Sequence, residues 1–237
     1  MNERPVILNF HGIGEPARPY EPGERPYWLG RDELERVLDL VQNVADIALT
    51  VDDGNSSDYE ILAPELRKRR LTATFFVLAA KLDQAGYLRR SQVRELAQGG
   101  FEIGSHGLHH VDWVSSDDAS LAREVAESKQ IIEAVTGRPV TAAAAPFGLY
   151  DRRVLRALAK AGYRRVFSSD GGPRLTAAWP TPRHTLQSGL DINALDRHVG
   201  RRSLYDRART EFRVLAKSLL LRSTIHPFAK PGRRSGQ

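Results

Sequence analysis

The stretch Ala48-Leu49-Thr50-Val51-Asp52-Asp53-Gly54 indicates how this chain is organised. It predicts a buried strand over residues 47–51 that runs directly into two adjacent carboxylates and a glycine. Neighbouring carboxylates repel each other, and a bound cation or a proton on one of them relieves that repulsion. Taken alone, Asp53-Gly54 is more typical of a solvated turn. The rest of the chain therefore has to decide between a metal site and a turn.

Strand and helix patterns alternate along the first two hundred residues. Apolar strands are predicted at residues 6–10, 101–105 and 140–145, and helical patterns lie between them. Short connections in such an alternation favour parallel strands with helices outside. About seven such units predict a distorted (β/α)7 barrel of the α/β class, similar to a TIM barrel. A doubly wound open sheet is the alternative, although the chain lacks a glycine fingerprint for phosphate binding.

In a barrel of this kind, the active site lies at the carboxyl ends of the strands. Residue types that can carry chemistry occur at the predicted ends of several strands. These residues are His11, Asp52, Asp53, His106, His110, Pro146, Phe147, Asp170 and His184.

Composition narrows the possible chemistry and location. The chain has no cysteine, so disulfides, thiolate metal ligands and a cysteine nucleophile are excluded. Apolar runs such as residues 75–80 are too short to span a membrane, and residues 1–10 lack the pattern of a secretory leader. From these features we expect a cytoplasmic protein.

The positive charge of the chain is concentrated at one end. The formal net charge is +6, yet residues 201–237 alone carry +8 and residues 1–200 carry −2. The first two hundred residues therefore do not predict a nucleic-acid partner. We expect a barrel domain over residues 1–200 and a basic amphipathic helix with a tail over residues 201–237. The helix has an apolar stripe at Leu204, Ala208, Phe212, Leu215 and Leu219.

Two interpretations of the C-terminal helix are open. It can cover the barrel with its apolar stripe and leave its basic side chains in solvent. Alternatively, residues 201–222 can lie on the anionic inner face of the membrane and bring the protein to lipid-linked sugars.

Two histidines in the middle of the chain have the spacing of metal ligands. His106 and His110 are four residues apart, so one helical turn would place both imidazoles on the same side. Gly107 follows the first histidine, so the pair is not the His-Glu-x-x-His motif of zinc proteases. Two histidines and one carboxylate would leave an open metal position, and either Asp52 or Asp53 can complete the set.

These motifs resemble the NodB-type polysaccharide deacetylases, carbohydrate esterase family 4. The family's Thr-Phe-Asp-Asp-Gly motif is similar to Thr50-Val51-Asp52-Asp53-Gly54, and its His-(Ser/Thr)-x-x-His motif is similar to His106-Gly107-Leu108-His109-His110. The resemblance implies the NodB homology fold and a zinc-type hydrolase that removes acetyl groups from N-acetyl sugars. It further implies Asp52 as general base and Asp53, His106 and His110 as ligands of Zn²⁺ or of Co²⁺, Ni²⁺ or Mn²⁺.

Two departures from the family pattern concern the base and the acid. Ala144 stands where the family has an arginine that pairs with the base, and Arg183 and Arg174 are candidates to replace it. No clean copy of the family's acid histidine is present, and we favour His184 over His11 and His226. From the resemblance, Pro146, Phe147 and His11 are assigned to substrate or oxyanion contacts.

The sequence therefore predicts a metal-dependent deacetylase that hydrolyses the acetamide C–N bond of an N-acetylated glycan or a lipid-linked sugar. Two alternatives remain: a related amidase that acts on a small non-sugar amide, and a catalytically silent glycan-binding barrel. The silent barrel is favoured by Ala144 and by the absence of a clear acid histidine.

Overall fold

A computed structural model of the chain describes residues 6–44, 46–171 and 179–200, together with residues 212, 214 and 216. Its centre is an eight-stranded sheet in the order β10-β1-β4-β5-β6-β7-β8-β9, and every pairing in it is parallel. The strands are β1 (Val6–Phe10), β4 (Ile47–Val51), β5 (Ala73–Val77), β6 (Glu102–Ser105), β7 (Ala142–Ala144), β8 (Arg165–Ser168), β9 (Thr181–Pro182) and β10 (His184–Thr185). A separate pair, β2 (Gly12–Ile13) and β3 (Trp28–Leu29), follows β1.

The two ends of the sheet meet at Arg183. β9 pairs with β8 and β10 pairs with β1, and these two short strands are separated by Arg183 alone. They therefore occupy one position in the sheet, which leaves seven strand positions around a nearly closed barrel. This confirms the predicted (β/α)7 barrel and excludes the doubly wound open sheet.

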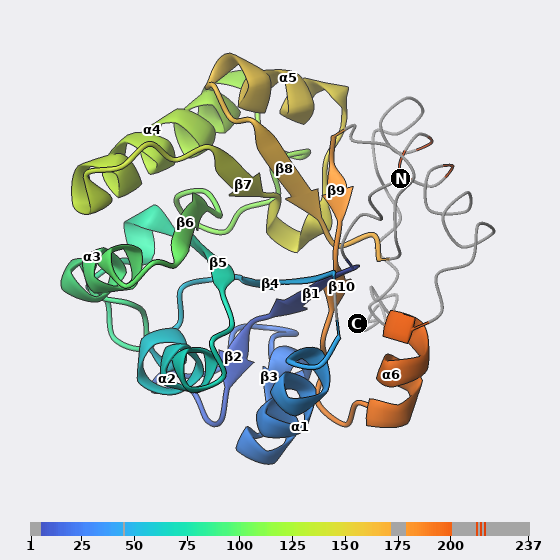
Figure 1. The fold of residues 1–237 in the computed structure, drawn as a ribbon. Coiled ribbons are helices and arrows are strands. Elements are labelled where there is room, and N and C mark those ends of the chain that lie inside the picture. Colours follow the sequence, from blue (N-terminus) through green and yellow to red (C-terminus); the bar gives the residue numbers. More distant parts are fainter. Residues whose placement is uncertain are drawn as a thin grey trace, which may run out of the picture.

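Helices cover the outside of the barrel, as Figure 1 shows. They are α1 (Arg31–Val41), α2 (Ala63–Lys68), α3 (Arg90–Gln98), α4 (Asp118–Thr136), α5 (Arg152–Lys160) and α6 (Ile192–Gly200). The sequence determines where the longest helix starts and stops: the Asp117 side chain accepts a hydrogen bond from Ser120 N at 2.9 Å, and Gly137 closes the helix with φ +66°.

Strand residues alternate between the helix-facing core and the barrel interior. The large outer core includes Leu8, Phe75 and Val166. A small interior cluster consists of Ile7, Phe76, Ala142, Ala144 and Phe167. Gly104 makes room for it, because a Cβ at this position would lie 2.5 Å from the Phe76 ring. The small residues of β6 and β7 thus let aromatic side chains enter a narrow barrel.

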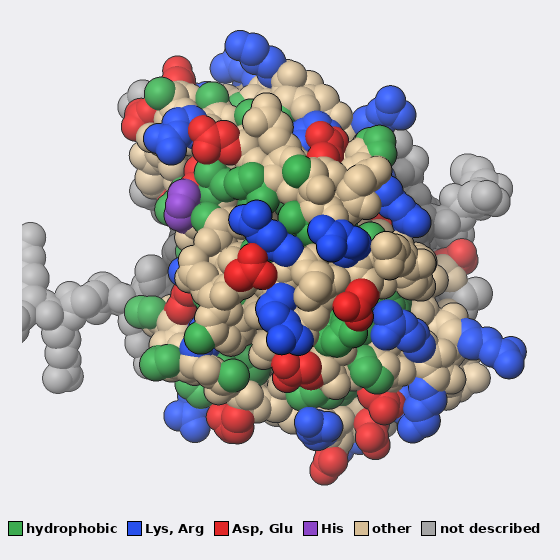
Figure 2. All heavy atoms as spheres, turned by 90° about the vertical axis from the view of Figure 1, so that its left-hand side faces the viewer, with side chains coloured by type: hydrophobic (Ala, Val, Ile, Leu, Met, Phe, Trp, Pro, Cys, Tyr) green, Lys and Arg blue, Asp and Glu red, His purple; other side chains and the backbone are tan. Residues whose placement is uncertain are grey.

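The outer face over α3 and α4 carries mixed charge. Figure 2 shows Lys and Arg side chains interspersed with Asp and Glu on this side of the molecule. Two ion pairs lie along α4, Arg123–Glu127 and Lys129–Glu133. Basic and acidic side chains therefore alternate on this face rather than gather by sign.

Most of the predicted C-terminal domain lies outside the described residues. Phe212 is 75% exposed and Val214 is 2% exposed. The division at residue 200 and the extent of the helix stay predictions. Within the described ranges, no helix combines the length and the apolar character that crossing a bilayer requires.

Candidate active site

A cleft of about 1060 Å³ opens at the carboxyl ends of the strands. Pro146 is buried beside Phe147 and does not belong to the lining. The predicted strand-end residues that line the cleft are His11, Asp52, Asp53, His106, His110, Phe147, Asp170 and His184. The structure thus brings together side chains that the sequence places at the ends of separate strands.

Asp53, His106 and His110 converge on one point. Each offers a ligand atom within 4.8 Å of the other two. Asp53 Oδ1 lies 3.5 Å from His106 Nε2 and 3.7 Å from His110 Nε2. This oxygen is buried and has no hydrogen-bond partner among the described residues. A buried carboxylate oxygen facing two imidazole nitrogens is a donor set that suits zinc and similar divalent ions, so these residues fit a metal.

His106 is held in the orientation that a metal ligand needs. Its Nδ1 donates to Ala144 O at 3.0 Å, which leaves Nε2 directed at Asp53. Burial lowers the pKa of His106 to about 4, so its imidazole is neutral near pH 7. The neutral ring keeps a lone pair on Nε2 available for a cation. Ala144 therefore supports the site through its backbone carbonyl, although its side chain lacks the family's guanidinium.

Glu124 shapes the loop that carries both histidines. Its Oε2 accepts hydrogen bonds from Leu108 N at 2.8 Å and His109 N at 3.3 Å, and its Oε1 lies 2.7 Å from His109 Nδ1. A Cβ on Gly107, whose φ is +87°, would lie 2.9 Å from the same Oε2. The glycine in place of the family's hydroxyl residue thus leaves room for a buried carboxylate.

Glu124 was missed at the level of sequence. A signal was available, because it falls between Leu121 and Val125 on the buried face of α4, where a charge is out of place.

Asp52 lies beside the cluster of Asp53, His106 and His110 and is paired with a buried arginine. Arg183 Nη1 donates to Asp52 Oδ1 and Arg183 Nη2 donates to Asp52 Oδ2, both at 2.7 Å. Burial alone would raise the pKa of Asp52, but this bidentate guanidinium holds it well below its ordinary value. Arg183 is thus the arginine that replaces the one missing at Ala144. The other candidate, Arg174, lies outside the described residues.

A short polar network fixes this ion pair inside the barrel. Asn9 Nδ2 donates to Asp52 Oδ2 at 2.9 Å, and Asn9 Oδ1 accepts from Thr50 Oγ1 at 2.7 Å and from Arg183 Nη1 at 2.9 Å. The guanidinium lies 5.4 Å from the Phe76 ring centre, within the interior cluster. Asn9 was also not identified from the sequence, although an amide side chain inside an otherwise apolar strand could have pointed to it.

The structure places His11 next to Asp52. His11 Nε2 lies 3.9 Å from Asp52 Oδ2, and His106 Nε2 lies 3.9 Å from the same oxygen. Its ring packs 5.1 Å from the ring of Tyr27 at the cleft wall. His184 lines the same cleft, next to Arg183 in the chain. Both histidines thus stay candidates for the acid, and His226 lies outside the described residues.

Phe147 forms an apolar wall beside the metal cluster. Its ring lies 4.3 Å from that of His110, and the side chain is 47% exposed. Its backbone adopts φ +57°, which is unusual for an aromatic residue and typical of strained positions at functional sites. An exposed aromatic face at the rim suits contact with the apolar face of a sugar ring.

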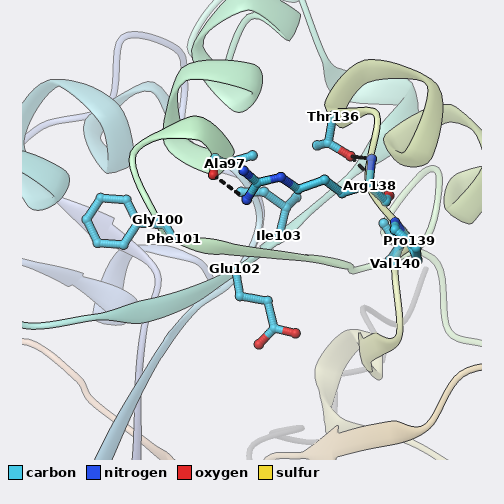
Figure 3. Close-up of a pocket in the computed structure, with 9 residues that line it drawn as sticks. All are labelled: Ala97, Gly100, Phe101, Glu102, Ile103, Thr136, Arg138, Pro139 and Val140. Carbon is cyan, nitrogen blue, oxygen red and sulfur yellow. Dashed lines mark hydrogen bonds between the residues drawn. The ribbon is translucent and has the colours of Figure 1, made fainter.

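A second pocket lies at the opposite end of the strands, near the beginning of β6. Figure 3 shows Arg138 turned toward Ala97, whose carbonyl oxygen it contacts at 2.7 Å, while Glu102 points away from it. Glu102 is itself engaged by Thr74 Oγ1 at 2.8 Å and by Arg165. This pocket of about 250 Å³ therefore has its charged groups already paired and does not compete with the cleft as an active site.

Comparisons with known proteins agree with this geometry. The family model described as polysaccharide deacetylase matches residues 41–166. The chain is 28% identical over 144 residues to a peptidoglycan-N-acetylglucosamine deacetylase of Bacillus cereus. The matched region covers 59% of this chain and 65% of the relative. It is 31% identical over 124 residues to a chitooligosaccharide deacetylase of Rhizobium leguminosarum bv. phaseoli. The matched region covers 50% of this chain and 51% of the relative. The chain thus spans between half and two thirds of the length of these two proteins.

Solved structures share the fold. The Streptococcus pyogenes deacetylase PplD superposes with a TM-score of 0.72 at 19% identity, covering 83% of this chain and 98% of that one. A polysaccharide deacetylase from Bacillus cereus, BC0361, gives a TM-score of 0.73 at 21% identity, covering 83% and 69%. These likenesses establish the barrel architecture.

Proposed function

Since the chain belongs to the polysaccharide deacetylase family, we propose that it hydrolyses the acetamide of an N-acetylated sugar with the help of a divalent metal ion. The observation that carries this proposal is the convergence of Asp53, His106 and His110 on one point, with Asp52 beside them in the cleft. Zinc is the ion that this donor set suits first, with Co²⁺, Ni²⁺ or Mn²⁺ as substitutes.

The residues of the chain have distinct roles in this proposal. Asp53, His106 and His110 would hold the ion, and the bound ion would supply Lewis-acid activation of the amide carbonyl. Asp52 takes the proton of the attacking water, and its low pKa keeps it ionised for that task. Arg183 fixes the orientation of Asp52 through two hydrogen bonds. The C–N bond then breaks, and the leaving amine must receive a proton.

The size of the cleft supports a glycan substrate. At about 1060 Å³ its volume lies just above the range of small-molecule sites, roughly 300–1,000 Å³. Two aromatic side chains line the cleft, Tyr27 against His11 and Phe147 against His110. Such faces suit sugar rings better than they suit a small free amide. A lipid-linked sugar as substrate, a membrane contact through residues 201–222 and a location at the inner membrane face stay predictions.

The test is acetate release from N-acetylglucosamine oligomers by the purified full chain. We expect turnover that stops after treatment with a chelator and returns when Zn²⁺ is added back. Faster turnover of simple amides than of the oligomers would favour the related amidase. Metal binding without turnover of any acetylated substrate would instead identify a silent glycan-binding barrel. The Arg183–Asp52 pair already weakens that last alternative, because the base keeps an arginine partner despite Ala144.

The proton donor can be identified by comparing two histidine variants. We expect His11→Gln to lower kcat by about 10²–10⁴-fold, the usual loss for a general acid, because His11 lies 3.9 Å from Asp52 at the reacting centre. We expect His184→Gln to cost much less, so His11 replaces His184, the residue favoured from the sequence, as the proposed acid. Steady-state kinetics on the same oligomer checks both, with metal content measured in each variant. A large loss in His184→Gln and none in His11→Gln would return the role to His184.

A further inference from the structure

The loop over residues 14–24 reaches the cleft, and the proposed function assigns it no role. It connects β2 to the segment before β3, and its residues Arg18, Glu21, Pro22, Gly23 and Glu24 line the cleft. The loop carries several charged side chains, of which two contact the segments that hold the metal cluster.

Glu21 is the residue of this loop that faces a metal-site histidine. Its Oε2 lies 3.8 Å from His110 Nδ1, the ring nitrogen opposite the one that faces Asp53. Its Oε1 accepts a hydrogen bond from Tyr87 OH at 2.9 Å and lies 3.8 Å from Lys81 Nζ. One carboxylate oxygen is thus held by Tyr87 and Lys81 while the other is presented to His110.

The loop is anchored a second time, next to Asp53. Arg18 Nη2 donates to Asn55 Oδ1 at 2.9 Å, and Asn55 follows Asp53 by two residues. Arg18 is kept in place by a bidentate pair with Glu24 and by the Tyr87 ring, whose centre lies 4.6 Å from its guanidinium carbon. The loop that carries Glu21 is therefore anchored to the segment that carries Asp53 and to Tyr87.

We propose that Glu21 is a positioning residue, which orients His110 through its Nδ1 and thereby sets the affinity of the metal site. A carboxylate on the outer nitrogen of a ligating histidine fixes the tautomer and increases the basicity of the inner nitrogen. His106 obtains the equivalent support from the buried Ala144 carbonyl. His110 obtains it from a loop side chain that is 39% exposed. This inference rests on the proposed metal site.

The test compares two glutamates of the same loop in the full chain. Glu21→Ala removes the contact, and Glu15→Ala is its matched control, because Glu15 is exposed and its side chain accepts a hydrogen bond from Tyr20 OH at 2.9 Å. The dissociation constant of Zn²⁺ is measured by competition with a coloured chelator. The visible spectrum of the Co²⁺ form then reports the geometry around the ion. Far-UV circular dichroism of the metal-free proteins verifies folding.

We expect Glu21→Ala to weaken Zn²⁺ binding by about 10–100-fold, the usual effect of removing such a support, and to change the Co²⁺ spectrum. Glu15→Ala should alter neither, and Glu21→Gln, which keeps the shape without the charge, should fall between Glu21→Ala and the unchanged protein. Equal Zn²⁺ affinity and identical spectra in Glu21→Ala and Glu15→Ala would overturn the inference. If the unchanged protein binds no metal, the proposed function fails first, so the two failures are distinguishable.

Discussion

Asp52→Asn is expected to lower kcat by about 10²–10⁴-fold on an N-acetylglucosamine oligomer while Zn²⁺ still binds. The amide has nearly the same shape as the carboxylate but cannot accept a proton from water. The substitution leaves the proposed metal ligands, Asp53, His106 and His110, untouched. Steady-state kinetics and metal analysis on the same preparation provide the measurement.

The substitution also has a structural cost that the experiment must separate from catalysis. Asp52 Oδ1 accepts from Arg183, and Oδ2 accepts from both Arg183 and Asn9. In asparagine one of these positions is an NH₂ group, which would face donors. We therefore expect a loss of roughly 1–3 kcal/mol in the free energy of unfolding, the usual cost of an unsatisfied buried group. Assays belong well below the midpoint of thermal unfolding, so that the variant remains folded.

His106→Ala is the matched variant that distinguishes base from ligand. It removes an imidazole whose Nε2 lies 3.5 Å from Asp53 Oδ1, so both metal binding and turnover should be lost. Full activity of Asp52→Asn would remove Asp52 from the role of base. Loss of metal in Asp52→Asn would instead make Asp52 a ligand.

The barrel and the convergence of the strand-end residues could be predicted because both follow from local patterns. Alternating strands and helices with short connections leave few parallel arrangements. Once the strands are parallel, their carboxyl ends share one edge, so Asp53 and His106 must lie on the same side of the sheet. The closure of the barrel follows the same logic, since residues 181–185 form the segment that joins β8 to β1.

The partners of these residues could not be predicted, because they depend on side-chain packing between distant segments. Arg183 and Arg174 were equal candidates in the sequence, and only the barrel geometry directs Arg183 to Asp52, 131 residues away. Glu21 and Glu124 come from a loop and a helix rather than from strand ends, so no strand pattern points to them. Which of His11 and His184 protonates the leaving amine likewise depends on their positions in the cleft, and sequence spacing does not reveal those positions.

Arg183→Met is expected to destabilise the metal-free protein by about 3–5 kcal/mol at pH 7. The methionine stem can still pack beside Phe76 and Phe167, which lie 5.4 and 5.9 Å from the guanidinium carbon. What is lost is the partner of a buried carboxylate, because Asp52 is 2% exposed. Urea unfolding of the two metal-free proteins gives the difference.

The pH dependence of this difference has a definite sign. In the unchanged protein the pKa of Asp52 is depressed, so the ion pair contributes stability above the unfolded-state value of about 3.9 and loses it as pH falls. Without Arg183, burial dominates and raises the pKa of Asp52 above that value. The variant therefore loses stability as pH rises from about 4. The difference in free energy of unfolding between the variant and the unchanged protein should shrink on acidification. A defect of equal size at pH 7 and pH 4 would contradict an electrostatic origin.

The double variant Asp52→Asn/Arg183→Met separates stability from catalysis. Removing both charges leaves no unpaired ion in the barrel, so the free energy of unfolding should recover a large part of the loss seen in Arg183→Met. Turnover should not recover, because the base is absent. Restored activity would show that another residue takes the water proton. An Arg183→Met protein as stable as the unchanged one would mean that Asp52 is already neutral in the fold, and the bidentate pair could then no longer explain its role as a base.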